Sequence, residues 1–79
     1  MKVRLFRFMK PAQTIEVEPG TTLLAFLPTL GLDPSVWWSA KLNPWGGVFS
    51  YCIDDGWVPN HTLDESVTEI RVQPHVFGS

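Results

Sequence analysis

The stretch "VTEIRVQ" (residues 67–73) decides the fold, because it predicts a strand near the far end of the chain. Its residues alternate between two faces: Val67, Glu69, Arg71 and Gln73 against Thr68, Ile70 and Val72. A period of two is typical of a β-strand. The first residues, "MKVRLFRF" (1–8), alternate in the same way. We therefore expect the last strand to complete a sheet beside the strands at the N-terminus.

The N-terminal strand is predicted to continue into a hairpin. The segment "MKPAQ" (9–13) supplies a proline-containing turn. The next segment, "TIEVEP" (14–19), alternates again, with Ile15 and Val17 on one face. Two adjacent alternating runs joined by a short turn indicate an antiparallel pair.

The segment "EPGTTLLAFLPTLGL" (18–32) changes to a helical period. Thr21 or Thr22 is expected to cap the N-terminus of a helix. Pro28 cannot donate a backbone hydrogen bond, so we expect a short helix that ends near Leu27 or is kinked there, with Gly31 as a left-handed cap. The predicted apolar face of this helix consists of Leu23, Leu24, Leu27 and Leu30.

Residues 33–47 are expected to form an aromatic-rich insertion or loop. Asp33 and Pro34 fit a second helix start, and they fit equally a turn that leads into a strand. After this segment, "VFSYCI" (48–53) alternates as a strand, Asp54-Asp55-Gly56 indicates a tight turn, and "WVP" (57–59) predicts a short strand.

The bulk composition describes one small globular domain over residues 1–79 and limits its functions. The net charge is −2 and the six Lys and Arg form no clustered basic face, so no nucleic-acid partner is expected. No apolar run reaches membrane-spanning length, so no membrane partner is expected either. Cys52 is the single cysteine and cannot form an internal disulfide. We expect a cytoplasmic protein.

A hairpin, a helix and a returning strand resemble the β-grasp (ubiquitin-like) superfamily. The resemblance implies an α+β fold, a mixed sheet with one short helix packed across it. "TIEVEPGTTLLAFL" (14–27) is similar to the second strand and helix entry of ubiquitin. "CIDDGWVPNHTLDESVTEIRVQPHVFG" (52–78) resembles the second half of the small sulfur-carrier proteins of molybdopterin and thiamine biosynthesis.

The sulfur carriers act through a C-terminal Gly-Gly that is adenylated and converted to a thiocarboxylate. In the C-terminal tail (74–79), Gly78 matches one of these glycines, while Phe77 and Ser79 depart from the pattern. The resemblance therefore implies, as one alternative, a carrier that acts through Gly78.

A second alternative is a ferredoxin-like subunit of a dehydrogenase complex. "VEPGTTLLAFL" (17–27) and "IRVQPHVF" (70–77) resemble parts of the iron–sulfur subunit of succinate dehydrogenase. A two-iron cluster needs four Cys thiolates, and this chain has Cys52 alone. The resemblance thus implies a descendant without the cluster and without a redox role.

The third resemblance is to small tail-assembly proteins of long-tailed bacteriophages. "GGVFSYCIDDGWVP" (46–59) and "EIRVQPHVFG" (69–78) are similar to segments of these proteins. The resemblance implies a structural subunit of a phage tail tip, with protein partners and a place in the virion.

Residues that could perform chemistry have simpler structural interpretations. Cys52 with His61 or His75 could form a thiol nucleophile and its base, but a lone Cys within a strand is usually a small buried apolar residue. The spacing of Cys52, Asp54 and the histidines matches no zinc pattern, so no metal or other cofactor is expected. Asp54 and Asp55 are interpreted as turn residues.

The aromatic residues point instead to protein binding. Four Trp, together with Phe6 and Phe8, are too many to fit beneath one short helix, and aromatic residues in loops are typical of interface hot spots. The candidate partner-binding residues are Trp37, Trp38, Trp45, Trp57 and Phe77. The leading interpretation is a non-enzymatic protein–protein interaction or structural subunit.

Overall fold

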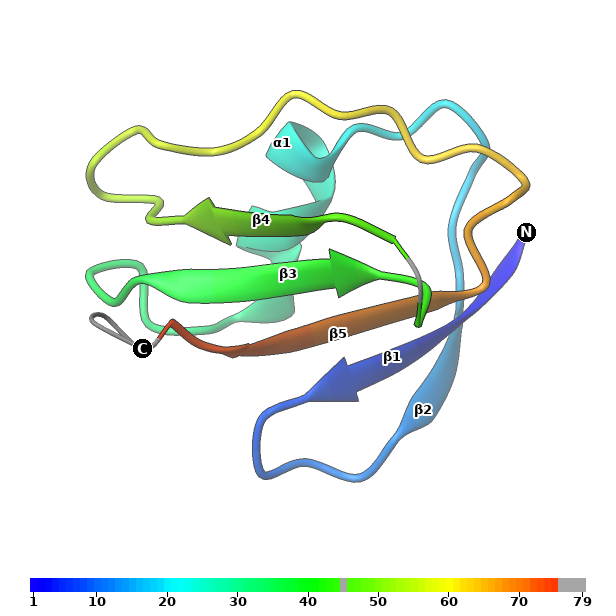
Figure 1. Ribbon diagram of the computed structural model, residues 1–79, viewed down its shortest axis with the longest axis horizontal. Helices are drawn as coiled ribbons and strands as arrows, with labels where there is room; N and C mark the ends of the chain where they lie inside the picture. Colours follow the sequence, from blue (N-terminus) through cyan, green and yellow to red (C-terminus); the bar gives the residue numbers. More distant parts are fainter. Residues whose placement is uncertain (45, 76–79) are drawn as a thin grey trace.

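The chain forms a mixed sheet with one short α-helix on one face, and the protein belongs to the α+β class. The computed structural model describes residues 1–44 and 46–75. Within them the strands are β1 (Lys2–Arg7), β2 (Gln13–Glu16), β3 (Trp38–Leu42), β4 (Val48–Tyr51) and β5 (Glu69–Pro74). The helix α1 (Leu23–Phe26) continues as a 3₁₀ turn, η1 (Leu27–Leu30) (Figure 1).

The strand order is β2-β1-β5-β3-β4, so the first and last strands lie together at the centre of the sheet. β1 and β5 run parallel, with Leu5 opposite Ile70. The other neighbouring pairs are antiparallel. The prediction that the last strand completes the sheet beside the N-terminal hairpin is confirmed.

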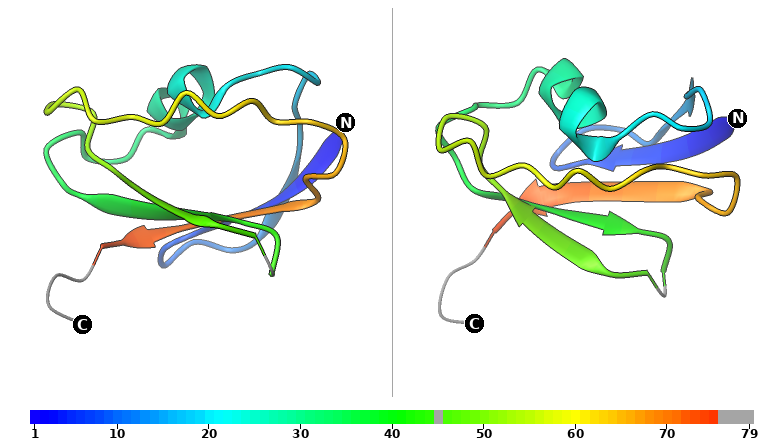
Figure 2. Two further views of the ribbon diagram at one scale, coloured as in Figure 1. Left: turned by 45° about the horizontal axis from the view of Figure 1, so that its top comes forward. Right: turned by 90° about the horizontal axis from the view of Figure 1, so that it is seen from above.

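The core lies between the sheet and the segments that cover one of its faces. Figure 2 shows α1 and the long connection from β4 to β5 on this face, while the opposite face carries none of the described elements. Each large apolar side chain that is fully buried here contributes roughly 1.5–3 kcal/mol to stability. The buried cluster consists of Val3, Leu5, Val17, Leu23, Phe26, Leu27, Trp38, Ala40, Leu42, Tyr51, Leu63, Val67, Ile70 and Val72.

The helix begins and ends where its cap residues predict. The Thr22 hydroxyl accepts a hydrogen bond from the Ala25 amide (3.2 Å), and Gly31 ends the 3₁₀ turn with φ 71°. Pro28 lies in the first turn of η1, where a missing donor is tolerated. The predicted apolar face is wrong at Leu24, which is 49% exposed. Phe26 is buried instead.

Residues 33–47 are not a loop or insertion over their whole length, because β3 lies within them and pairs with both β4 and β5. Trp38, Ala40 and Leu42 point into the core. Asp33 does not start a helix. Its carboxylate accepts hydrogen bonds from the Ser35 amide (3.0 Å) and hydroxyl (2.7 Å) in a turn that leads into β3, and these bonds lower the pKa of Asp33.

Residues 57–59 do not form the predicted strand, although Trp57 makes an isolated bridge with Cys52. The expected tight turn lies between these two bridged residues, with Gly56 at φ 68°. After the bridge, the chain leaves the sheet and crosses the face that carries α1 (Figure 2). β4 (Val48–Tyr51) is therefore an edge strand of the sheet, and the bridge lies just beyond its end.

Candidate protein interface at the β4 edge

The outer side of β4 presents backbone groups that no other strand of the described residues uses. Leu42 donates from its amide to the Gly47 carbonyl (3.4 Å), which sets the phase of the β3–β4 ladder. Bonded pairs in an antiparallel ladder alternate with non-bonded pairs. Val48 and Ser50 are therefore in non-bonded positions, and their N–H and C=O groups point away from β3.

Cys52 confirms this phase, because it lies two residues beyond Ser50 and uses its outward groups. Its amide donates to the Trp57 carbonyl (2.9 Å), and the Trp57 amide donates to the Cys52 carbonyl (3.1 Å). Along this edge the outward backbone groups of Cys52 are therefore hydrogen-bonded, whereas those of Val48 and Ser50 have no partner among residues 1–44 and 46–75.

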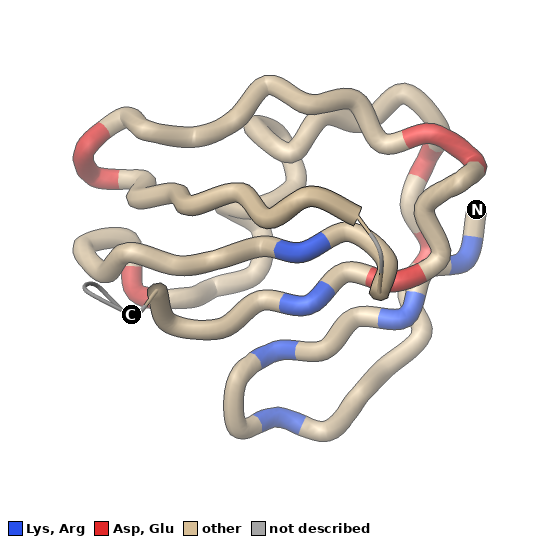
Figure 3. The backbone as a smooth tube through the Cα atoms, in the orientation of Figure 1, with Lys and Arg blue, Asp and Glu red and all other residues tan. Residues whose placement is uncertain are grey.

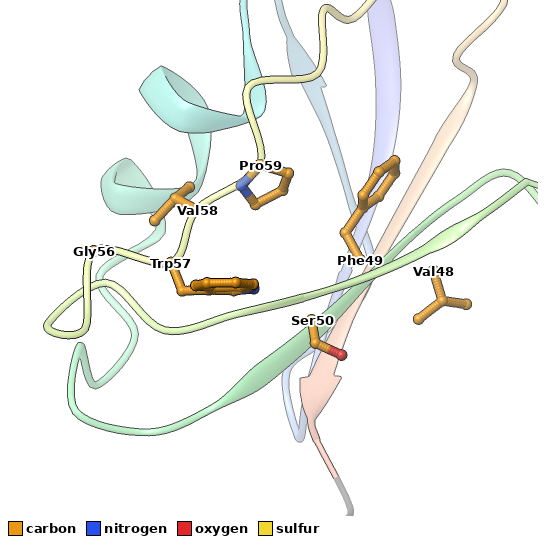
Figure 4. Close-up of a pocket in the computed structure, with 7 residues that line it drawn as sticks. All are labelled: Val48, Phe49, Ser50, Gly56, Trp57, Val58 and Pro59. Atoms are coloured by element: carbon orange, nitrogen blue, oxygen red, sulfur yellow. The ribbon is translucent and has the colours of Figure 1, made fainter.

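An apolar groove with a volume of about 500 Å³ runs along this open edge. It is lined by Val48, Phe49 and Ser50 on one side and by residues 56–59 on the other (Figure 4). The Trp57 side chain is 65% exposed and that of Val48 is 59% exposed. Large apolar side chains exposed beside unpaired strand groups are typical of a surface that binds another protein.

The walls of the groove are held in place by contacts with the rest of the protein. Figure 4 shows Phe49 on one side of β4 and Val48 and Ser50 on the other. The Phe49 ring packs against His61, with ring centroids 5.1 Å apart. The Ser50 hydroxyl lies 3.2 Å from Nδ1 of His75.

The structure separates the aromatic residues that the sequence grouped together. Trp57 lies at the groove and is exposed, as expected for a partner-binding residue. Trp38 is wrong as a surface candidate, because it is 8% exposed and its indole N–H donates to the Asp33 carbonyl (3.0 Å) inside the fold. Trp37 is half-buried, and its carbonyl accepts from the His75 amide (3.0 Å). The other candidates, Trp45 and Phe77, and the tail residue Gly78 lie outside the described residues.

Val48 is a groove residue that the sequence interpretation missed. A signal was present, because residues 46–53 contain no charged side chain. An uncharged strand between a Gly-Gly pair and an acidic turn is a candidate for an unprotected edge.

The uncovered face of the sheet is polar and charged. Figure 3 shows Lys and Arg along β1, β3 and β5, whereas β4 carries no charged residue. Phe6 on this face lies beside two guanidinium groups, Arg71 at 4.0 Å and Arg4 at 5.3 Å from its ring centroid. Arg71 also forms an ion pair with Glu69 (2.8 Å). These contacts engage Arg4 and Arg71 within the sheet, while β4 at its margin carries no charged residue.

Cys52 and the two histidines contact other groups of the protein. Cys52 is 2% exposed, and its thiol donates to the Pro34 carbonyl (3.4 Å). His61 packs on Phe49, and His75 Nδ1 lies 3.1 Å from the Ser39 hydroxyl. In the described part of the chain, no cluster of His, Cys, Asp and Glu has the size needed to hold a metal ion.

No helix in the described residues is both long and apolar enough to cross a membrane. No protein-family model matches the chain, and neither a curated protein nor a solved structure matches it.

Proposed function

We propose that this chain is a β-grasp domain that acts as a non-enzymatic interaction or structural subunit and binds a protein partner along the β4 edge. The observation that carries the proposal is the groove at that edge, where the exposed Trp57 and Val48 lie beside backbone groups of β4 that pair with none of the described residues. Burying a large ring such as that of Trp57 against a partner is among the strongest contributions to protein binding.

The strand order supports the β-grasp assignment. A parallel central pair made of the first and last strands, an antiparallel strand on each side and a short helix across one face correspond to that fold. Because one fold serves many functions, the edge and not the fold carries the functional proposal.

Assembly into a phage tail tip is the particular role that we propose. The segment 46–59 that resembles phage tail-assembly proteins is the segment that forms the edge: it contains β4, the acidic turn and Trp57. The resemblance and the exposed apolar surface therefore coincide in one part of the chain.

The test uses the native protein isolated from its own source, with the size of the complex measured by native mass spectrometry. Trp57→Ala should release the chain from its assembly. Phe8→Ala is the matched control, because Phe8 is also an exposed aromatic residue (51%) but lies away from the groove. A chain that ends at His75 should assemble as the wild type does.

The opposite pattern would support the sulfur-carrier alternative. In that case the chain ending at His75 would lose its partner, Trp57→Ala would keep it, and the intact mass of the native protein would show an added sulfur. These results would overturn the structural proposal.

A further inference from the structure

We infer that the partner at the β4 edge is a second copy of this chain, paired β4 to β4 in an antiparallel arrangement about a two-fold axis at Phe49. The inference rests on the proposed function, since it names the occupant of the same edge. It joins two five-stranded sheets into one continuous sheet.

The first argument is the pattern of unpaired backbone groups. Val48 and Ser50 lie on either side of Phe49, and both direct an N–H and a C=O outward. With the two-fold axis at Phe49, Val48 of each copy lies opposite Ser50 of the other. Every outward group of both residues then finds a donor or an acceptor, as in a regular antiparallel ladder. An edge that satisfies a copy of itself is what a two-fold interface needs.

The second argument is that β4 lacks the features that keep edge strands apart. Charged side chains and prolines on an edge discourage pairing with another chain. The sequence of β4 is Val-Phe-Ser-Tyr, with neither. Two copies can therefore approach without like charges meeting along the strand and without burying a charge.

The third argument is the sign of the charges at the two ends of β4. Lys41 lies opposite Val48 at the first end, and Asp54 and Asp55 follow the last end. An antiparallel arrangement brings the first end of one copy toward the last end of the other. The basic end of each copy thus faces the acidic turn of its partner, which favours this orientation over a parallel one.

The groove adds apolar contact to the backbone pairing. Trp57 lies alongside the edge and is exposed where the second strand would be added. Because β4 is four residues long, the contact is small, and small interfaces give weak, concentration-dependent association. We expect a dimer that forms in the upper micromolar range.

The test is sedimentation equilibrium of the purified chain up to about 1 mM, at the weak end of specific association. Two substitutions at the β4 edge are compared with the same substitutions at the β2 edge. Val48→Glu faces Lys41 within its own chain, and its control Thr14→Glu faces Arg4, so both new carboxylates gain a nearby cation. Val48→Glu should raise the dissociation constant of the dimer roughly tenfold. The new carboxylate lies at the contact between the two β4 strands and near the partner's acidic turn. Thr14→Glu should leave it unchanged.

The second substitution removes one outward N–H group. Ser50→Pro deletes a donor that β3 does not use, and Thr14→Pro deletes the equivalent outward donor on β2, since the Val17 amide bond to the Met1 carbonyl (2.9 Å) sets that phase. Ser50→Pro should weaken the dimer roughly tenfold through lost hydrogen bonds. Circular dichroism and the melting temperature show whether each variant is folded, and Val48→Glu keeps the test valid if Ser50→Pro is not.

Amide exchange measured by NMR locates the contact in the wild type. The Val48 and Ser50 amides should exchange more slowly as the concentration rises, whereas those of Thr14 and Glu16 should not. A chain that stays monomeric at 1 mM overturns the inference, and so does a dimer that is equally sensitive to Val48→Glu and Thr14→Glu. Neither result touches the proposed function, which depends on whether Trp57→Ala releases the chain from its assembly.

Discussion

The sheet of the described residues has two edge strands, β2 and β4, and their side chains differ in charge and in exposed apolar surface. β2 carries Glu16, whose carboxylate lies 3.3 Å from the N-terminal amine, and the strand is flanked by Pro11 and Pro19. β4 carries no charge, and beside it lies the apolar groove with Trp57. Both edges leave outward backbone groups at every second residue.

The two edges leave similar outward backbone groups and differ in their side chains, so the side chains distinguish them. Charged side chains and prolines at an edge strand discourage pairing with another chain, whereas an uncharged edge beside an exposed aromatic ring permits such pairing. The β4 edge is therefore the one at which we propose that a partner binds.

A substitution at the centre of the sheet should weaken both edges together, with the largest effect. Ile70 is fully buried in β5, opposite Leu5 of β1 and Leu42 of β3. Ile70→Ala should lower the free energy of unfolding by about 3 kcal/mol, because it leaves a cavity, and Ile70→Val should cost about 1 kcal/mol. Urea denaturation measures both, and amide exchange should accelerate on β2 and β4 alike. A loss below about 1 kcal/mol for Ile70→Ala would contradict the central role of β5.

A substitution at Asn43 should affect the β4 side more than the β2 side. Asn43 follows β3, and its side-chain carbonyl accepts from the amides of Thr68 (2.9 Å) and Glu69 (3.1 Å), while its amide group donates to Ser66 (3.0 Å). These bonds attach the β3–β4 hairpin to the start of β5. Asn43→Ala should cost about 2 kcal/mol, because it removes the side-chain acceptor of two partly buried hydrogen bonds and the donor of a third.

Asn43→Gly is the control, because Asn43 has a positive φ of 63°. Glycine adopts this conformation without strain, so Asn43→Gly should cost about 1 kcal/mol less than Asn43→Ala. Equal stability of the two variants would show that the hydrogen bonds alone decide the effect. The β4 amides should lose more protection from exchange than those of β2.

The smallest effect is expected at the end of β4, where Tyr51 is fully buried. Its hydroxyl finds no hydrogen-bond partner among the described residues, and burial raises the pKa of Tyr51 from 10.0 to about 12. Tyr51→Phe removes a buried hydroxyl that has no partner among the described residues and should stabilise the fold by about 1 kcal/mol. A loss of stability would instead show that the hydroxyl has a partner.

The pH dependence of the same residue provides a second measurement. The folded state holds the Tyr51 proton more tightly than the unfolded state. The resulting contribution of Tyr51 protonation to the free energy of unfolding is fully present below pH 10 and is lost as the pH rises toward 12. Melting temperatures from pH 8 to 11.5 should fall more steeply for the wild type than for Tyr51→Phe. If the melting temperatures of the two proteins fell equally with pH, the raised pKa of Tyr51 would be contradicted.

Local patterns in the sequence predicted much of the fold. β1, β2 and β5 were found because their side chains alternate strictly, and the helix ends were found because Thr22 and Gly31 have cap chemistry. β3 was one of two alternatives, because Asp33 and Pro34 fit a helix start as well as a turn that leads into a strand, although Trp38, Ala40 and Leu42 alternate with Ser39 and Lys41. Pro44, Gly46 and Gly47 favoured a loop near the end of the segment.

The candidate interface was harder to predict, because an edge is a property of strand order. Trp57 was expected at an interface and is exposed, whereas Trp38 looks the same in sequence and is buried. Val48 becomes an edge residue only once β5 has paired with β3 and left β4 at the margin. Pairings between distant segments decide this, and no local pattern reports them.

The parallel pairing of β1 with β5 also affects how the protein is made. A ribosome releases β1 first and must synthesise more than sixty further residues before β5 can pair with it. Until then Val3 and Leu5 have no partner strand on that side, so the nascent chain carries an incomplete core. Pairings that join such distant segments fold slowly, and exposed strands aggregate easily. We therefore expect the core to remain incomplete until β5 has been synthesised and has paired with β1.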